Sequence, residues 1–276
     1  MSENDINAYS VWEKLAPYYD EVNGINDRNM VEATTLKHGD RMLKILEYFG
    51  YDQKKGLVVD LGCGTGNLCC YLGFLGYRVV GVDISAEMIK ISQRKQAMYG
   101  LGNVTFVQKD ALALDNNDIG GPIGFLYSKE GFSHFPDLRY MFGIFSHLFS
   151  LMPPSTVFIF EVFTEMGIGV LVTKVRRQYP NFIYEQGGLY DHDKKNGYID
   201  YRITLSDTDN QVITTQLPIY FWDMEVFNDL LTRAGFRKIE FFDDTIDVVY
   251  SSGASTIALR PPSFLSETFL VKAEKL

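Results

Sequence analysis

The chain has 276 residues, of which 46% are hydrophobic and 22% are charged, so it is long and apolar enough for one large globular domain. Its formal net charge of −9 at pH 7 argues against nucleic acid or an anionic membrane as a partner, because both require a basic face. The polar N-terminus, the lack of a long apolar run and three cysteines without metal-site spacing predict a reduced, cytoplasmic protein with no membrane span and no metal.

Residues 1–50 are expected to be mostly helical. Apolar residues recur at helical spacing from Ala8 to Ala16, and Pro17 is expected to break or kink this first helix. A second amphipathic helix that includes Met42 and Phe49 should end at Gly50.

Between residues 57 and 163 the pattern alternates strands and helices, which is typical of right-handed βαβ units in a parallel sheet. The expected strands lie at 57–61, 78–83, 104–108, 123–128 and 155–163, with helices at about 66–75, 85–99 and 136–152. Ligands of such sheets bind beyond the carboxyl ends of the strands.

The most informative segment runs from Val58 to Asn67, where a buried strand leads into a turn with glycines at alternate positions. These glycines let the backbone approach a ligand closely, and the helix that follows offers unpaired N–H groups. Asp60 closes the strand and favours a ligand with an amino group over a phosphate at this point. The next strand ends at Asp83, 21 residues after Gly62, where Rossmann-type folds place the acid that binds ribose hydroxyls.

A dinucleotide-binding dehydrogenase is the nearest alternative for this turn. Its fingerprint, Gly-x-Gly-x-x-Gly, would need a glycine at the position of Asn67. The spacing therefore disfavours nicotinamide and flavin cofactors, and a nucleotide-like fold that binds nothing is a second alternative.

The pattern formed by Asp60, Gly62, Gly64 and Gly66 resembles the first motif of the class I S-adenosylmethionine-dependent methyltransferases, an acid followed by Gly-x-Gly-x-Gly. The resemblance implies an α/β, Rossmann-like fold with a seven-stranded, mostly parallel sheet and helices on both faces. It also implies that S-adenosyl-L-methionine is the cofactor, with one acid on the ribose and one on the adenine amino group. The implied cofactor-binding residues are Tyr19, Asp60, Gly62, Cys63, Gly64, Gly66, Asp83, Ile84, Asp110, Ala111 and Ser128.

In this family the N-terminal helices pack over the cofactor as a lid. The segment from Ala16 to Asp20 resembles the family's Ala-x-x-Tyr-Asp, which implies that Tyr19 faces the methionine end of the cofactor. A tyrosine that merely packs a helix on the sheet is the alternative.

The loop after the fourth strand holds the candidate catalytic residues. Residues 131–134 resemble a loop of small-molecule N-methyltransferases such as those that dimethylate amino sugars, which implies that His134 is a base or orients the acceptor. The alternatives are a histidine hydrogen-bonded beneath the loop and one that caps a helix. Glu130 is the competing base, because an apolar pocket raises the pKa of a carboxylate. Glu161 could pair a cationic amine or form a structural ion pair.

After Thr164 the pattern predicts a helical stretch to about Gln178 and then an antiparallel insert at 180–222 that is rich in aromatic residues. The aromatic residues could line the acceptor pocket, where their faces bind cations, or could pack an ordinary half-buried sheet or a dimer contact. A helix at 223–234 and strands at 237–242 and 267–273 should complete the fold, and residues 246–264 are expected to be a loop of unknown role.

Together these features predict one methyltransferase domain over residues 1–276, with a helical lid at 1–50 and the insert at 180–222 over the acceptor site. The expected reaction moves the methyl group of S-adenosylmethionine to a nitrogen, or less readily an oxygen, of a small metabolite, in a monomer or homodimer. The alternatives are an enzyme that uses the same cofactor without methylation, and a non-catalytic cofactor-binding sensor or subunit.

Overall fold

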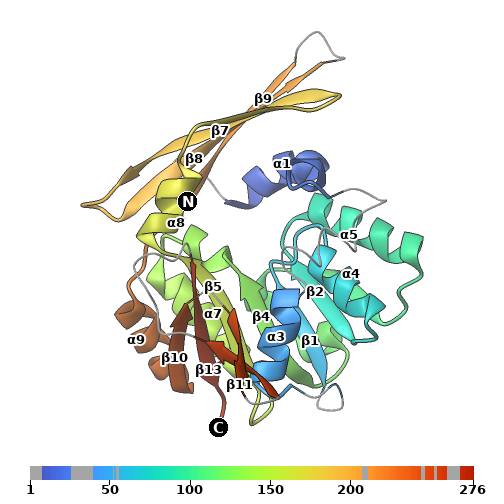
Figure 1. Ribbon diagram of the computed structural model, residues 1–276, viewed down its shortest axis with the longest axis vertical. Coiled ribbons are helices and arrows are strands. Elements are labelled where there is room, and N and C mark those ends of the chain that lie inside the picture. The colour runs from blue at the N-terminus through green and yellow to red at the C-terminus, as the bar shows by residue number, and fades with distance from the viewer. Residues whose placement is uncertain are drawn as a thin grey trace.

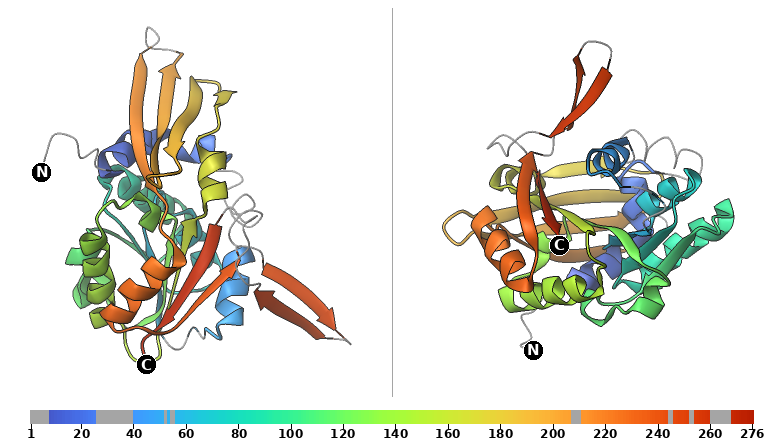
Figure 2. Two further views of the ribbon diagram at one scale, coloured as in Figure 1. Left: turned by 90° about the vertical axis from the view of Figure 1, so that its left-hand side faces the viewer. Right: turned by 90° about the horizontal axis from the view of Figure 1, so that it is seen from below.

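The computed structural model describes residues 8–25, 40–51, 53, 56–206, 211–243, 246–251, 254–259 and 268–276. A central sheet carries helices on both faces, and a second sheet stands over one edge of it (Figure 1). A hairpin projects from the side of the molecule (Figure 2). No helix within the described ranges is long and apolar enough to cross a membrane.

The central sheet has seven strands in the order β10-β13-β5-β4-β1-β2-β3. These are β1 (Leu57–Leu61), β2 (Val79–Asp83), β3 (Val104–Gln108), β4 (Ile123–Lys129), β5 (Val157–Phe163), β10 (Arg237–Asp243) and β13 (Thr268–Glu274). Strand β13 runs antiparallel to both of its neighbours, and the other pairs are parallel. The predicted seven-stranded, mostly parallel sheet is confirmed.

Helices cover both faces of this sheet because its central strands are apolar on both sides; all five residues of β1 are buried. One face packs against α7 (Leu138–Leu151) and α9 (Met224–Ala234), around phenylalanines that include Phe145 and Phe160. The other face packs against α3 (Asp40–Tyr48), α4 (Asn67–Phe74) and α5 (Ala86–Tyr99). Short helical segments η3 (Ala111–Ala113), α6 (Asn116–Ile119) and η4 (Gly131–His134) complete the connections.

Helix α1 (Ala8–Val22) corrects one expectation, because it continues through Pro17 instead of breaking there. Pro17 is exposed, so its ring lies on the outer side of the helix, while Val11 and Leu15 are buried on the inner side. This tertiary packing offsets the hydrogen bond that a proline removes. Helix α3 ends just before Gly50, as predicted, and Gly50 has a φ of 64°.

The antiparallel sheet contains β6 (Val175–Gln178), β7 (Phe182–Asp191), β8 (Asn196–Leu205) and β9 (Val212–Tyr220). The helix predicted to reach Gln178 is therefore wrong in its second half: α8 (Glu165–Leu171) ends early, and β6 pairs with β7. One face of the sheet buries aliphatic and aromatic residues against α1. Helix α1 contacts both β9 and α5, so it lies between the two sheets (Figure 1).

The expected loop at 246–264 contains a hairpin instead. Strand β11 (Ile246–Ser251) pairs in antiparallel fashion with β12 (Ala254–Leu259). Both segments contain β-branched residues, which favour strands, although no recognisable motif marks them in the sequence. The rest of that segment lies outside the described residues.

Candidate active site

The glycine-rich turn after β1 has two distinct parts. Gly62, Gly64 and Gly66 all have positive φ, at 73°, 54° and 77°. A Cβ atom on Gly62 or Gly64 would meet no atom within 4 Å, whereas one on Gly66 would lie 2.6 Å from the Phe106 ring. The first two glycines therefore border open space that a ligand can occupy, and the third permits close packing of α4 on β3.

Asp83 is held beside this turn by two backbone N–H groups. The Gly64 N–H donates to its Oδ2 at 2.8 Å, and the Ser85 N–H donates to its Oδ1 at 2.9 Å. Burial raises the pKa of Asp83, and these hydrogen bonds oppose the rise. Ile84, the next residue, is 41% exposed. The carboxylate is thus fixed at the carboxyl end of β2, as the sequence predicts.

Asp60 lies deeper, with 4% of its surface exposed. The Cys69 thiol donates to its Oδ2 at 3.3 Å. Burial raises the pKa of Asp60 to about 7, with a smaller rise from the charge of Asp83. Cys63, within the turn, has a pKa raised by burial to about 11, so its thiol stays protonated at neutral pH. All three cysteines are free.

Asp110 follows β3 and begins η3. Its Oδ1 accepts the Leu112 N–H at 2.8 Å, and its Oδ2 accepts the Tyr140 hydroxyl of α7 at 2.8 Å. Each oxygen has a second lone pair, so this carboxylate can still accept a further hydrogen bond. Ala111, beside it, is half-buried.

The end of β4 adopts an unusual backbone. Glu130 has a φ of 59°, the left-handed region that non-glycine residues rarely enter. Its N–H donates to the Glu161 carbonyl at 2.9 Å, and its carboxylate lies 3.4 Å from the Lys129 ammonium. Ser128, two residues earlier and within β4, is buried. Backbone strain of this kind is common at functional sites and supports a site at this bend, although Ser155, Lys195 and Lys238 also have positive φ elsewhere in the fold.

Tyr19 on α1 lies over this edge of the central sheet. It is half-buried and contacts Trp12 edge-on, with ring centroids 6.1 Å apart. Burial raises the pKa of Tyr19; the charge of Lys129 opposes the rise and the charge of Glu130 adds to it. Trp12 in turn contacts the ring of His134, so Tyr19 is linked through Trp12 to the segment that follows β4.

His134 has one ring nitrogen engaged. Its Nδ1 lies 2.8 Å from the Pro218 carbonyl oxygen of β9. A carbonyl only accepts, so Nδ1 carries the proton and Nε2 keeps a lone pair. The ring contacts Trp12 and Phe163, and burial lowers the pKa of His134 below its ordinary 6.5. The imidazole is thus neutral near pH 7 and fixed in one tautomer.

Glu161, at the end of β5, forms a structural ion pair. Its carboxylate lies 2.5 Å from the Arg41 guanidinium of α3, and the Tyr127 hydroxyl donates to it. Burial alone would raise the pKa of Glu161, but Arg41 and Lys129 hold it below its ordinary value. Of the two interpretations offered by the sequence, the ion pair is the one that the contacts support.

The aromatic residues of the insert divide into two groups. Tyr184 and Tyr201 lie on the side of the sheet that faces α1, and the charges of Tyr19 and Glu130 contribute to the raised pKa of Tyr201, after burial and Tyr184. In contrast, Tyr220 and Trp222 stack on each other, away from this group. The first pair can line an acceptor pocket.

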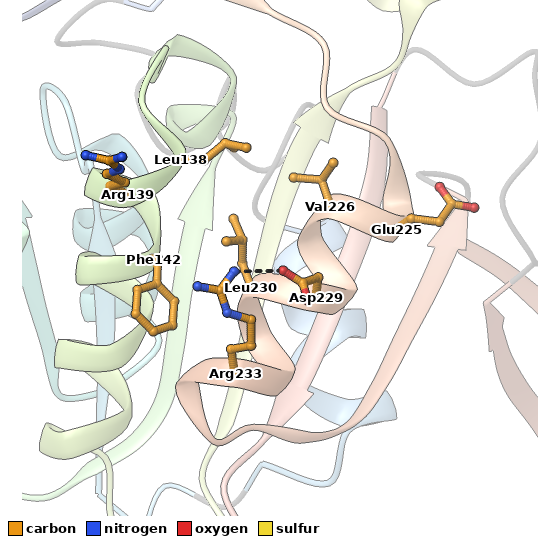
Figure 3. Close-up of a pocket in the computed structure, with 8 residues that line it drawn as sticks. All are labelled: Leu138, Arg139, Phe142, Glu225, Val226, Asp229, Leu230 and Arg233. Atoms are coloured by element: carbon orange, nitrogen blue, oxygen red, sulfur yellow. Dashed lines mark hydrogen bonds and ion pairs between the residues drawn. The ribbon is translucent and has the colours of Figure 1, made fainter.

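A surface groove of about 380 Å³ lies elsewhere, between α7 and α9 (Figure 3). Phe142 and the paired Arg233 and Asp229 line it, and none of the predicted site residues does. His192 is exposed in a turn, 3.8 Å from Glu165. Within the described ranges, no three histidine, cysteine or acidic residues gather in a way that could hold a metal ion.

Sequence reasoning missed a polar cluster that joins α1 to the glycine-rich turn, made of Asp20, Thr65, Asn67 and Lys95. One signal was available. Lys95 falls on the same stripe of α5 as the buried Met88 and Ser92, and a lysine at such a position indicates a buried charge that needs a partner.

The fold and this edge together define a Rossmann-like site for an adenosine-containing cofactor: a glycine turn after β1, an acid at the end of β2 and another after β3. Comparison with known proteins supports such a cofactor. Residues 58–151 match the family described as "Methyltransferase domain". The chain therefore contains a segment similar to the methyltransferase domains that use S-adenosylmethionine as cofactor.

Two curated relatives are putative methyltransferases. One from Bacillus subtilis is 21% identical over 63% of this chain, and the match spans 64% of that protein, just under two thirds. One from a Geobacillus species is 26% identical over 86% of this chain and 93% of its own. A shorter match, 31% identical over 30% of this chain and 20% of the relative, is to a tRNA (guanine(10)-N2)-dimethyltransferase of Methanothermobacter thermautotrophicus.

Solved structures share the fold at low identity. A S-adenosylmethionine-dependent methyltransferase from Clostridium acetobutylicum has a TM-score of 0.69 and 16% identity, over 96% of this chain and 98% of that one. A sugar N-methyltransferase from a Streptoalloteichus species has a TM-score of 0.62 and 11% identity, over 91% of this chain and 94% of that one.

Proposed function

We propose that this enzyme methylates a nitrogen, or less readily an oxygen, of a small-molecule acceptor, in the cytoplasm and as a monomer or homodimer. The observation that carries the proposal is the neutral, oriented His134, whose Nε2 keeps its lone pair beside the strained end of β4. The residues around the glycine-rich turn and the elements that cover the carboxyl edge of the central sheet also support it.

The residues around the glycine-rich turn fit the cofactor. Open space above Gly62 and Gly64 accommodates it, with Cys63 and Gly66 shaping the turn. On the adenosine part, we propose that Asp83 binds the ribose hydroxyls, Asp110 binds the adenine amino group, and Ile84 and Ala111 contact the adenosine faces. At the methionine end, the proposed contacts are Asp60, Ser128 and Tyr19. Bound S-adenosylmethionine supplies an electrophilic methyl group.

The acceptor site is proposed to lie between the central sheet and its covers. Helix α1, from the lid predicted at 1–50, and the sheet of the insert predicted at 180–222 cover the carboxyl edge (Figure 1). A site covered by a helix and a second sheet suits a small molecule better than a polymer. We assign the rings of Tyr19 and Tyr201, on α1 and on the sheet face packed against it, and the Glu130 carboxylate to attracting a cationic amine.

His134 is the proposed base. An amine acceptor must lose a proton, and the Nε2 lone pair can take it while the Pro218 carbonyl stabilises the imidazolium through the Nδ1 proton. Glu130 already pairs with Lys129, so we assign it to attracting the ammonium group and not to removing its proton. The sugar N-methyltransferase among the similar structures supports nitrogen as the acceptor atom.

Methyl transfer from labelled S-adenosylmethionine to a panel of small amines, amino sugars, alcohols and phenols tests the proposal. We expect incorporation into one class of amine, at a rate well above that into its hydroxyl analogue. Exclusive transfer to the hydroxyl compounds, or none to either class by a chain that binds the cofactor, would contradict the proposed acceptor.

A further inference from the structure

The cluster of Asp20, Thr65, Asn67 and Lys95, called the Asp20 cluster below, connects three elements that are distant in the sequence. Asp20 lies on α1, directly after Tyr19. Its Oδ1 accepts the Thr65 hydroxyl at 2.6 Å and the Asn67 side-chain amide at 3.0 Å, and its Oδ2 lies 2.5 Å from the Lys95 ammonium of α5. Helix α1 is thereby attached directly to the glycine-rich turn.

Lys95 makes this attachment energetically important. The residue is 4% exposed, and its ammonium also donates to the Thr65 carbonyl at 3.1 Å and to the Asn67 side-chain oxygen at 2.6 Å. Asp20 is the carboxylate that compensates its charge in this cluster. A buried charge that loses its ionic partner is strongly unfavourable, so the arrangement around Lys95 favours α1 in its docked position.

The same contacts fix the turn. Thr65 and Asn67 flank Gly66, whose left-handed backbone packs closely on Phe106 and Ser92. Gly64, one residue before Thr65, donates its N–H to Asp83. Any shift of α1 that breaks the Asp20 contacts therefore also removes side-chain hydrogen bonds from Thr65 and Asn67, which lie in and directly after the turn assigned to the cofactor.

We propose that Asp20 and Lys95 are positioning residues that make cofactor binding and the docking of α1 cooperative. The docked helix holds the turn in its binding conformation, and cofactor on the turn in return stabilises the docked helix and with it Tyr19. This inference depends on the cofactor and not on the proposed acceptor, so it stands or falls separately from the acceptor assignment.

Calorimetric titration with S-adenosylmethionine tests the proposal in four variants: Asp20→Asn, Lys95→Met, the double variant, and Glu21→Gln as control. Glu21 is the next residue of α1, and its side chain is exposed. We expect each single variant to bind the cofactor at least tenfold more weakly and the double variant to be no weaker than the worse single one, with the control unchanged. Additive losses, or native affinity in Asp20→Asn, would overturn the proposal.

Amide hydrogen exchange provides the second readout, because a merely structural role would not alter it in the same way. In the native chain and in Glu21→Gln, S-adenosylmethionine should slow exchange throughout α1. In Asp20→Asn, at cofactor concentrations that give equal occupancy, this protection should be lost. Equal protection of α1 in Asp20→Asn, or a lowered Tm with native affinity, would mean that the Asp20 cluster only stabilises the fold, and the proposal would be wrong.

Discussion

His134 shows how one residue can satisfy two interpretations of the sequence at once. It is hydrogen-bonded beneath the loop, as the structural interpretation requires, and that same bond assigns the proton to Nδ1 and leaves Nε2 available. Burial among Trp12 and Phe163 then keeps the ring neutral, which a base needs. A fixed tautomer and a lowered pKa suit proton removal at neutral pH.

Replacement of His134 by alanine should therefore lower turnover by about 10²-fold or more, the usual range for loss of a general base. Affinity for S-adenosylmethionine should barely change, because the hydrogen bond of the ring is to β9 and the Asp20 cluster that attaches α1 to the glycine-rich turn stays intact in this variant. Steady-state kinetics and calorimetry on the same preparation separate the two effects. Glu130→Gln is the matched variant, which should raise KM for a cationic acceptor more than it lowers kcat; native turnover in His134→Ala would contradict the assignment.

We expect Asp60 to make cofactor binding depend on pH. Its pKa of about 7 lies above the ordinary 3.8 because the carboxyl is buried, so it is largely protonated below neutrality. The negative form attracts the cationic methionine end of the cofactor, and affinity should fall as pH decreases through 7. We expect binding about tenfold weaker at pH 6 than at pH 8, since occupancy of the charged form changes tenfold per unit below the pKa.

Calorimetry across this pH range, with Asp60→Asn as the comparison, checks the cause. The variant should bind more weakly at pH 8 and show a much flatter dependence. The same steep dependence in Asp60→Asn would assign the titration to another group.

At the scale of elements, we expect Gly66 of the glycine-rich turn to act mainly on stability and Gly62 mainly on cofactor binding. Gly66→Ala places a Cβ 2.6 Å from Phe106 and 2.7 Å from Ser92 at a φ of 77°, whereas Gly62→Ala meets no protein atom within 4 Å at a similar φ. Both substitutions carry backbone strain of about 1–3 kcal/mol. Only Gly66→Ala adds overpacking, which costs about 1–3 kcal/mol more.

Urea unfolding and cofactor titration of the two variants form a matched test. Gly66→Ala should lose clearly more unfolding free energy than Gly62→Ala, while Gly62→Ala should lose cofactor affinity despite its smaller loss of stability. Equal destabilisation with equal affinity would show that the two glycines do not have separate roles.

The elements that the sequence predicted well are those whose signal is local. The apolar runs of β1, β2, β3 and β4 and the helix stop at Gly235 fall within one or two residues of their expected places. Strand β6 was missed because four residues, Val175–Gln178, carry little periodicity and become a strand only by pairing with β7. The Asp20 cluster was missed for a similar reason: Asp20 and Thr65 are 45 residues apart, and only the fold brings them together.

At the scale of the whole molecule, the two sheets and α1 are layered, and acidic side chains gather at the edge of the central sheet that faces α1. Asp60, Asp83, Asp110 and Glu130 all lie at or beyond the carboxyl edge of the central sheet, and the chain as a whole carries a net charge of −9. A nucleic-acid backbone would be repelled by this distribution, because such binding relies on neutralising phosphates with basic side chains. The relative named for tRNA matches only 30% of the chain, so its acceptor need not be shared.

We therefore expect no methyl transfer to RNA above the background of the His134→Ala variant. Bulk tRNA and ribosomal RNA, incubated with the enzyme and labelled S-adenosylmethionine and collected on filters, provide the measurement. Low salt makes the test stringent, because it favours any electrostatic binding that exists. Label in RNA that depends on His134 would show that a polymer can enter between the central sheet and α1, and the small-molecule acceptor would then be wrong.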